Sequence, residues 1–127
     1  MKIIVVDDSK LMRQRIIGLI SDIPGVDISA EAASSIEAIE LLEKLKPDVI
    51  ILDIRMPEGN GLKVLKYIQQ KESSVITIVF TNYPLKQYKD KCMELGADYF
   101  FDKSNEFEKL LEVVQKLSIH KGIQDKM

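Results

Sequence analysis

The chain has 127 residues and a formal net charge of −2, with 46% hydrophobic and 30% charged residues. This is the size and balance of one globular domain that buries a core without disulfide or metal staples. Acidic and basic residues are mixed along the chain, so charge gives no reason to expect nucleic-acid or membrane binding. Cys92 is the sole cysteine, which excludes an intramolecular disulfide, and the apolar start is too short for a signal peptide or a membrane span. We therefore expect a cytoplasmic protein.

Strand-like and helix-like patterns alternate along the whole chain. In chain order the predicted strands are Ile3–Val6, Val26–Ala32, Val49–Leu52, Val75–Phe80 and Ala97–Phe101. The predicted helices carry apolar stripes, in the same order, over Met12–Ile23, Ile36–Leu45, Leu62–Ile68, Leu85–Leu95 and Phe107–Leu117. Three of the strands are nearly continuous apolar runs, which suit parallel strands covered on both faces.

Other local signals sharpen these assignments. Val26–Ala32 alternates between apolar and polar residues, as an edge strand with one wet face does. Ser34, with Glu37 three residues later, has the spacing of a capping box at the start of the second helix. Cys92 falls on the apolar stripe of the fourth helix and is expected to pack in the core. Residues 118–127 are polar and aperiodic, and we expect them to form a frayed C-terminal tail after a folded unit of residues 1–117.

Strict alternation predicts an α/β protein with a (βα)5 pattern. Right-handed crossovers then give a doubly wound, parallel five-stranded sheet with helices on both faces. Edge strands that expose one face to solvent favour the flavodoxin-like strand order 2-1-3-4-5, with the first strand near the centre.

Polar side chains follow the carboxyl ends of four predicted strands. Asp7 and Asp8 come directly after the first strand, Asp53 after the third and Thr81 after the fourth, and Lys103 lies two residues past the fifth. In an open α/β sheet these ends border the ligand crevice. We therefore expect three carboxylates, a hydroxyl and an ammonium group to converge on one rim.

This set of side chains predicts phosphoryl transfer. Carboxylates that crowd together raise one another's pKa and oppose ionisation, and a hard cation removes this conflict. Mg²⁺ suits a site with few carboxylates that keeps waters. Lys103 and Thr81 would supply a positive charge and a hydrogen-bond donor to anionic oxygens of a ligand. Asp53 would be the attacking nucleophile.

The same residues resemble the receiver domain of bacterial two-component response regulators, including the chemotaxis regulators. The resemblance spans roughly residues 2–117. Each motif is weak alone, but five motifs in the right order at the right strand ends are specific. The motifs are Asp7-Asp8, Asp53 followed by Met56-Pro57 and Gly61, Thr81, Lys103, and the stretch Gly96–Lys103.

The resemblance implies a role for each residue of the rim. Asp53 would accept a phosphoryl group from the phosphohistidine of a sensor histidine kinase or a phosphotransfer protein. Asp8, Asp53 and the backbone carbonyl of Arg55 would bind Mg²⁺, and Asp7 would help through water. Lys103 would pair with a phosphoryl oxygen.

The resemblance also implies a conformational switch. Thr81 would move to bond another phosphoryl oxygen, and Phe100, the aromatic residue three positions before Lys103, would swing inward. The face formed by the fourth helix, fifth strand and fifth helix would then change shape to control a downstream output protein or domain, or self-association into a homodimer. Such a domain is a signalling switch rather than an enzyme, because it catalyses only its own phosphorylation and dephosphorylation.

The chain departs from the family pattern at two positions. Ser104 stands where the family commonly has a proline, often after a cis bond. A cis bond before a residue other than proline costs about 3 kcal/mol, which favours a trans bond here. Asn82 stands where alanine or glycine is frequent and is expected to affect how water reaches the phosphoryl group.

Two alternative functions also fit parts of the sequence. An aspartate-nucleophile phosphatase usually has an acidic acid/base residue two positions after the nucleophile. Here that residue is Arg55, which cannot transfer protons near neutral pH, and a cap domain is absent from the sequence. A receiver-like interaction module that is never phosphorylated typically loses one of the acidic, acceptor or lysine positions, and all of them are present here.

Overall fold

The computed structural model describes residues 1–56, 59–82 and 85–126. Pro57, part of one predicted motif, lies outside the described residues. The helices are α1 (Lys10–Ile20), α2 (Ser35–Leu45), α3 (Gly61–Gln70), α4 (Lys86–Glu94) and α5 (Phe107–Lys126). The strands are β1 (Lys2–Val6), β2 (Asp27–Ala32), β3 (Val49–Leu52), β4 (Arg55–Met56), β5 (Gly59–Asn60), β6 (Ile76–Thr81) and β7 (Tyr99–Asp102).

The main sheet is parallel and has five strands in the order β2-β1-β3-β6-β7. The predicted fourth and fifth strands are β6 and β7, so this is the predicted order 2-1-3-4-5, and the predicted flavodoxin-like fold is confirmed. Strands β4 and β5 form a separate antiparallel pair between β3 and α3. The sequence analysis did not predict this pair, because two-residue strands carry no periodicity that could reveal them.

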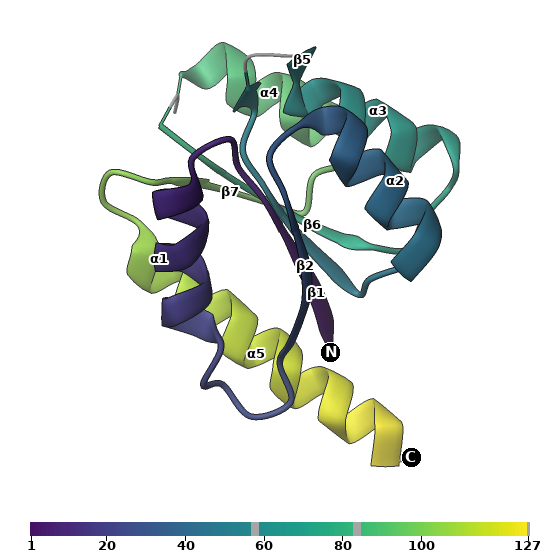
Figure 1. The fold of residues 1–127 in the computed structure, drawn as a ribbon, viewed down its shortest axis with the longest axis vertical. Coiled ribbons are helices and arrows are strands. Elements are labelled where there is room, and N and C mark those ends of the chain that lie inside the picture. Colours follow the sequence, from purple (N-terminus) through teal and green to yellow (C-terminus); the bar gives the residue numbers. More distant parts are fainter. Residues whose placement is uncertain (57–58, 83–84, 127) are drawn as a thin grey trace.

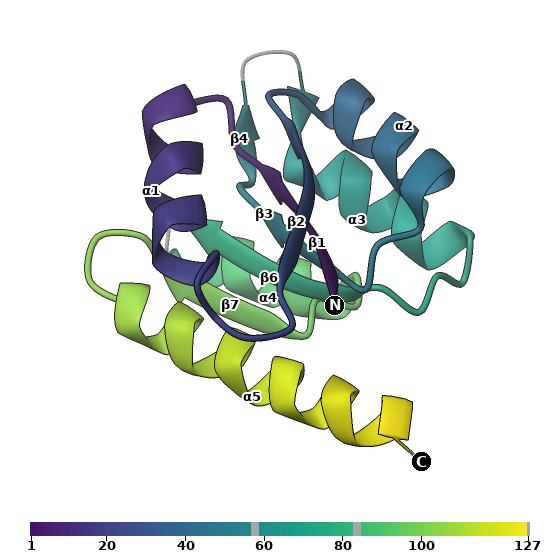
Figure 2. The same cartoon turned by 60° about the horizontal axis from the view of Figure 1, so that its bottom comes forward.

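Helices cover both faces of the sheet, as Figures 1 and 2 show. Helices α1 and α5 lie on one face, where Ile16 and Leu110 pack against β1, β3 and β6. Helices α2, α3 and α4 lie on the other face, where Leu65 and Cys92 are buried against the opposite side of the same strands. Burial of Cys92 confirms its predicted packing role. Strands β1 and β3 are covered on both sides, which explains why their sequences are continuously apolar.

Side-chain caps fix where three of the helices begin. Ser34 Oγ accepts the backbone N–H of Glu37 at the start of α2, as the predicted capping spacing requires. Ser9 Oγ accepts from Met12 at α1, and Asn60 Oδ1 accepts from Leu62 at α3. Because β1, β2 and β3 run parallel, the loops that follow them and the caps within those loops lie at one end of the sheet, which is the end that carries the site.

The expectation that helix ends near Leu117 and a frayed tail follows is wrong, because α5 continues to Lys126. Two polar contacts hold the extension on the body of the domain: the Ser118 hydroxyl donates to the carbonyl of Pro24, and Lys121 Nζ lies 3.7 Å from Asp48 Oδ1. Apolar periodicity cannot detect such contacts. Even α5, the longest helix in the described ranges, lacks the length and apolar character needed to cross a membrane, as do the others there.

Candidate functional site

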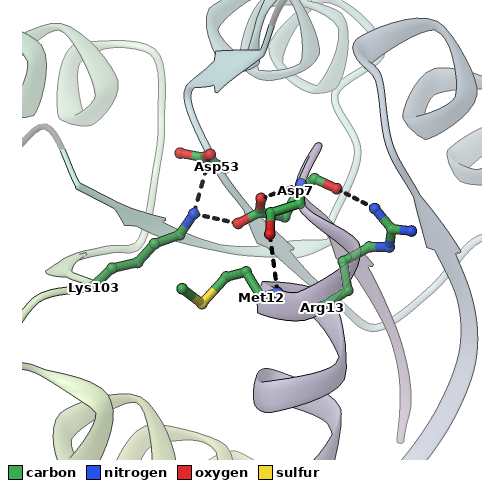
Figure 3. Close-up of polar contacts among 6 residues, drawn as sticks. Asp7, Met12, Arg13, Asp53 and Lys103 are labelled. Atoms are coloured by element: carbon green, nitrogen blue, oxygen red, sulfur yellow. Dashed lines mark hydrogen bonds and ion pairs between the residues drawn. The ribbon is translucent and has the colours of Figure 1, made fainter.

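The carboxylates of Asp7, Asp8 and Asp53 come together at the carboxyl ends of β1 and β3. One oxygen from each lies within 4.8 Å of the others. The Lys103 ammonium reaches this group from the loop after β7, as Figure 3 shows. A cavity of about 580 Å³ opens over the cluster, and its lining consists of Asp7, Asp8, Ser9, Met12, Asp53, Arg55, Met56, Asn82 and Lys103. The convergence predicted from the sequence is therefore observed for these residues.

Asp7 is held through all its polar groups. Its backbone N–H donates to the carbonyl of Ala32, and its Oδ1 accepts the backbone N–H of Ser9 at 2.9 Å. Its Oδ2 pairs with Lys103, and Arg13 of α1 donates to its backbone carbonyl at 2.6 Å. The side chain is 2% exposed. Asp7 is thus a fixed part of the frame, whereas Asp8 beside it is exposed at the cavity wall.

Lys103 is a buried cation between two carboxylates. Its side chain is 4% exposed, and its Nζ lies 3.1 Å from Asp53 Oδ2 in addition to the contact with Asp7. A buried ammonium group persists only where anions compensate its lost hydration. Lys103 is therefore positioned to neutralise negative charge that develops beside Asp53.

Burial raises the pKa of the Asp53 carboxyl, and the charge of Lys103 opposes this shift. The negative charge of Asp7 also raises it, while hydrogen bonding from Lys103 and Thr81 lowers it. Asp53 Oδ1 is buried without a hydrogen-bond partner in the part of the chain that the structure describes. An anionic oxygen in this state is costly, so the site is suited to a cation at that position.

The residues of the cluster fit Mg²⁺. Hard carboxylate oxygens are ligands that this ion prefers, and the cavity leaves room for the waters that it usually retains. Asp8 is exposed at the cavity, and Asp53 has a buried oxygen without a partner. Asp7, by contrast, has both carboxylate oxygens engaged by Lys103 and Ser9. The geometry therefore suits direct ligation by Asp8 and Asp53 better than by Asp7.

Comparison with known proteins gives the family. The model of the response regulator receiver domain matches residues 3–115. The chain belongs to this family. Protein CcdB of Bacillus subtilis is 34% identical over 94% of this chain and 98% of its own length. The response regulator domain of Thermotoga maritima CheB has 28% identity and a TM-score of 0.82, with 94% of each chain covered.

Other relatives are longer proteins that contain a receiver domain. A protein-glutamate methylesterase/protein-glutamine glutaminase of Treponema denticola is 33% identical over 92% of this chain, but the match covers 32% of that protein. The chain thus spans about a third of that relative's length. The shared part is the receiver domain, which in this family is a signalling switch.

The structure places the remaining predicted residues of the receiver site as follows. Thr81, at the end of β6, is fully buried, and its side chain interacts with the Asp53 carboxylate. Arg55 and Asn82 line the cavity with exposed side chains. Phe100 packs on the face of α2, α3 and α4, whereas Tyr99 packs on the opposite face, because successive side chains of a strand alternate. The roles of these residues stay predictions.

Sequence reasoning missed one residue of this receiver domain, Arg13, and missed the packing reason for another, Gly61. Arg13 bridges the Asp7 carbonyl and the Glu31 carboxylate of β2, at 2.6 and 2.9 Å. Its position on the first turns of α1, close behind the acidic pair, was the available signal. Gly61 lies so close to β3 that a Cβ there would meet the Asp53 carbonyl oxygen at 2.5 Å. The motif included Gly61, but this packing reason needs the structure.

Proposed function

We propose that this receiver domain is a phospho-switch that accepts a phosphoryl group on Asp53 from a histidine kinase or phosphotransfer protein. The observation that carries the proposal is the position of the Asp53 carboxylate. It lies 3.1 Å from the Lys103 ammonium, groups with Asp7 and Asp8, and faces an open cavity. This arrangement supplies a nucleophile, a fixed cation beside it, and a site for an anionic donor.

The proposed reaction moves one phosphoryl group. A carboxylate oxygen of Asp53 attacks phosphorus, and the bond between phosphorus and the histidine nitrogen of the donor breaks. The nitrogen keeps the electron pair of that bond. Lys103 pairs with one phosphoryl oxygen, so the charge arriving at Asp53 meets a cation that is already in place.

Mg²⁺ is the cofactor in this proposal, and Asp8, Asp53 and the carbonyl of Arg55 would hold it. The chemistry that the bound ion supplies is neutralisation of the phosphoryl oxygens. Asp7 would act indirectly, in line with its bonds to Lys103 and Ser9. The orphaned Oδ1 of Asp53 supports this assignment.

The proposed output is a change in the face formed by α4, β7 and α5. The Thr81 side chain would move toward Asp53 to bond a phosphoryl oxygen. The Phe100 side chain would then move inward into the space that Thr81 leaves. Strands β6 and β7 pair directly, with Thr81 opposite Asp102 and Val79 opposite Phe100, which supports coupling between them. The partner would be an output protein or domain, or a second copy of the chain, and we place the switch in the cytoplasm.

We further propose that the chain is not an enzyme acting on other substrates. A phosphatase would need a proton donor two residues after Asp53, and the exposed guanidinium of Arg55 cannot provide one. The methylesterase activity in the name of the Treponema denticola relative belongs to a protein of which this chain covers 32%. We therefore expect no turnover of ordinary phosphomonoesters in a standard phosphatase assay.

Labelling with a small phosphodonor tests the proposed function. Incubation with acetyl phosphate and Mg²⁺ should give one acid-stable, base-labile phosphoryl adduct, visible as a single mass increase. The adduct should be absent without Mg²⁺ and in Asp53→Ala. Asp90→Ala removes an exposed carboxylate from α4 and is the matched control, which should label like the parent. Equal labelling of Asp53→Ala and the parent would contradict the assignment.

A further inference from the structure

The turn that follows β7 is closed by hydrogen bonds that all involve Asp102. Its carboxylate Oδ1 accepts the backbone N–H of Ser104 at 2.9 Å and the Ser104 hydroxyl at 2.7 Å. Its own N–H donates to Glu106 Oε1 at 2.8 Å. Its carbonyl accepts the N–H groups of Asn105 and Glu106. The backbone N–H, the backbone carbonyl and the Oδ1 of Asp102 are thus all used inside the segment that surrounds Lys103.

Glu106 ties this turn to helix α5. Its side chain accepts from Asp102, its carbonyl accepts the N–H of Leu110, and its Oε2 lies 2.6 Å from Lys109 Nζ. Because Leu110 is fully buried in the core, the far end of the turn is fixed to the body of the domain. The near end is fixed by the Lys103 N–H, which donates to the carbonyl of Thr81.

Lys103 is the one residue of the turn whose side chain leaves it for the site. Ser104 and Asn105 are exposed, whereas the Lys103 side chain is 4% exposed and runs to Asp7 and Asp53. The Lys103 side chain is long and loses several rotamers when it is fixed, so its orientation depends on a backbone that does not move. The peptide bond between Lys103 and Ser104 is trans, as expected for this sequence.

We propose that Asp102, with Ser104 and Glu106, is a positioning residue that aims the Lys103 ammonium at Asp53. This inference rests on the proposed phosphorylation of Asp53. Hydrogen bonds from Ser104 hold the pKa of the Asp102 carboxyl below its usual value, and contacts with Lys109 and Asp102 do the same for Glu106. Both acceptors are therefore charged at neutral pH, and the turn stays closed in the range where the switch works.

Two variants of Asp102 separate positioning from charge. Asp102→Ala removes the acceptor and opens the turn, whereas Asp102→Asn removes the charge but keeps the Oδ1 that accepts from Ser104. We expect the rate of labelling by acetyl phosphate to fall about tenfold or more in Asp102→Ala, since small displacements of a reacting group are costly. We expect Asp102→Asn to stay within about twofold of the parent, as should the control Asp90→Ala.

A second measurement follows Lys103 without using phosphorylation. Brief acetylation with a water-soluble N-hydroxysuccinimide acetate, read by peptide mass spectrometry, reports how accessible each lysine is. Lys86, with a side chain that is 90% exposed, is the internal reference. Lys103 should be strongly protected in the parent and in Asp102→Asn, and clearly less protected in Asp102→Ala.

The outcomes are distinguishable. If the parent is not labelled on Asp53, the proposed function fails and this inference fails with it. If the parent is labelled but Asp102→Ala matches it in labelling rate and in Lys103 protection, the positioning role alone is overturned. Loss of labelling in Asp102→Asn with Lys103 still protected would also overturn it, since charge would then be the cause. If Asp102→Ala does not fold, Ser104→Ala should show changes in the same direction that are smaller, because the backbone N–H of residue 104 still donates to Asp102.

Discussion

The three aspartates at the carboxyl ends of β1 and β3 differ in their surroundings, although their chemistry is the same. Asp7 is buried and fully bonded, Asp8 is exposed at the cavity, and Asp53 is buried with one oxygen that has no partner among the described residues. Environment rather than residue type therefore sets what each carboxylate can do.

Substitution of Asp8 tests the division between these aspartates. Asp8→Ala should weaken Mg²⁺ binding by about tenfold or more, or ~1.4 kcal/mol, because it would lose a direct ligand. Asp7→Ala should cost less Mg²⁺ affinity, since both oxygens of Asp7 already have partners. Calorimetric titration gives both values, and Asp22→Ala, an exposed aspartate in the loop after α1, is the charge control. An unchanged titration in Asp8→Ala would rule out a metal site shared by Asp8 and Asp53.

The sequence predicted the side chains that converge at the site but not the residues that hold them. Asp53, Thr81 and Lys103 could be found because each follows a strand that its apolar run reveals. Arg13 was not singled out, because its role depends on a hydrogen bond to the backbone carbonyl of Asp7. Asp102 was not singled out either, because its role depends on hydrogen bonds inside the turn after β7. Such contacts leave no periodic trace in a single sequence.

Gly61 shows how one position links helix α3 to the segment after β3 that carries Asp53. A Cβ at residue 61 would meet backbone atoms of Asp53 and Ile54 at 2.5 and 2.9 Å, and backbone cannot yield cheaply. Gly61→Ala should lower the free energy of unfolding by about 1–3 kcal/mol and slow labelling of Asp53.

The control for this prediction is Gly18→Ala in α1, where a Cβ would have no neighbour within 4 Å. It should be neutral or stabilising by up to about 1 kcal/mol, because alanine favours helix over glycine. Chemical denaturation measures both variants. Equal stability of Gly61→Ala and Gly18→Ala would contradict the close packing.

Strand β6 carries a matched pair of threonines that tests the switch. Thr81 and Thr77 are both buried, four residues apart, but Thr81 alone lies at the site. Thr81→Ala should still label on Asp53 yet lose most of the spectral change that labelling causes in β7 around Phe100. Thr77→Ala should label and change like the parent. NMR spectra before and after labelling check this, and a full change across Phe100 in Thr81→Ala would refute the coupling.

The sheet and its order could be predicted because apolar runs marked the strands and apolar stripes marked the helices between them in strict alternation. The pair β4–β5 and the last turns of α5 could not. Strands β4 and β5 have only two residues each. The last turns of α5 are held by polar contacts of Ser118 and Lys121. Apolar periodicity in a sequence predicts which residues are buried, but it does not predict polar contacts between residues far apart in the chain.

The extension of α5 beyond Leu117 bears on the extent of the whole receiver domain, which we propose to be residues 1–117. Removing residues 118–127 deletes the hydrogen bond from Ser118 to Pro24 and the half-exposed pair of Lys121 with Asp48. The free energy of unfolding should fall by about 1–2 kcal/mol, and labelling of Asp53 should be retained. Ser118→Ala in the full chain isolates the hydrogen bond. Loss of labelling in the shortened chain would move the end of the functional unit past Leu117.

The central claim for the molecule is that Asp53 is the acceptor, and chemical mapping tests it most directly. An aspartyl phosphate is reduced by borohydride to homoserine, which marks the modified position permanently. After incubation with acetyl phosphate and Mg²⁺, reduction and peptide sequencing by mass spectrometry should find homoserine at position 53 and nowhere else. Homoserine at position 7 or 8, or its absence from a labelled protein, would contradict the account.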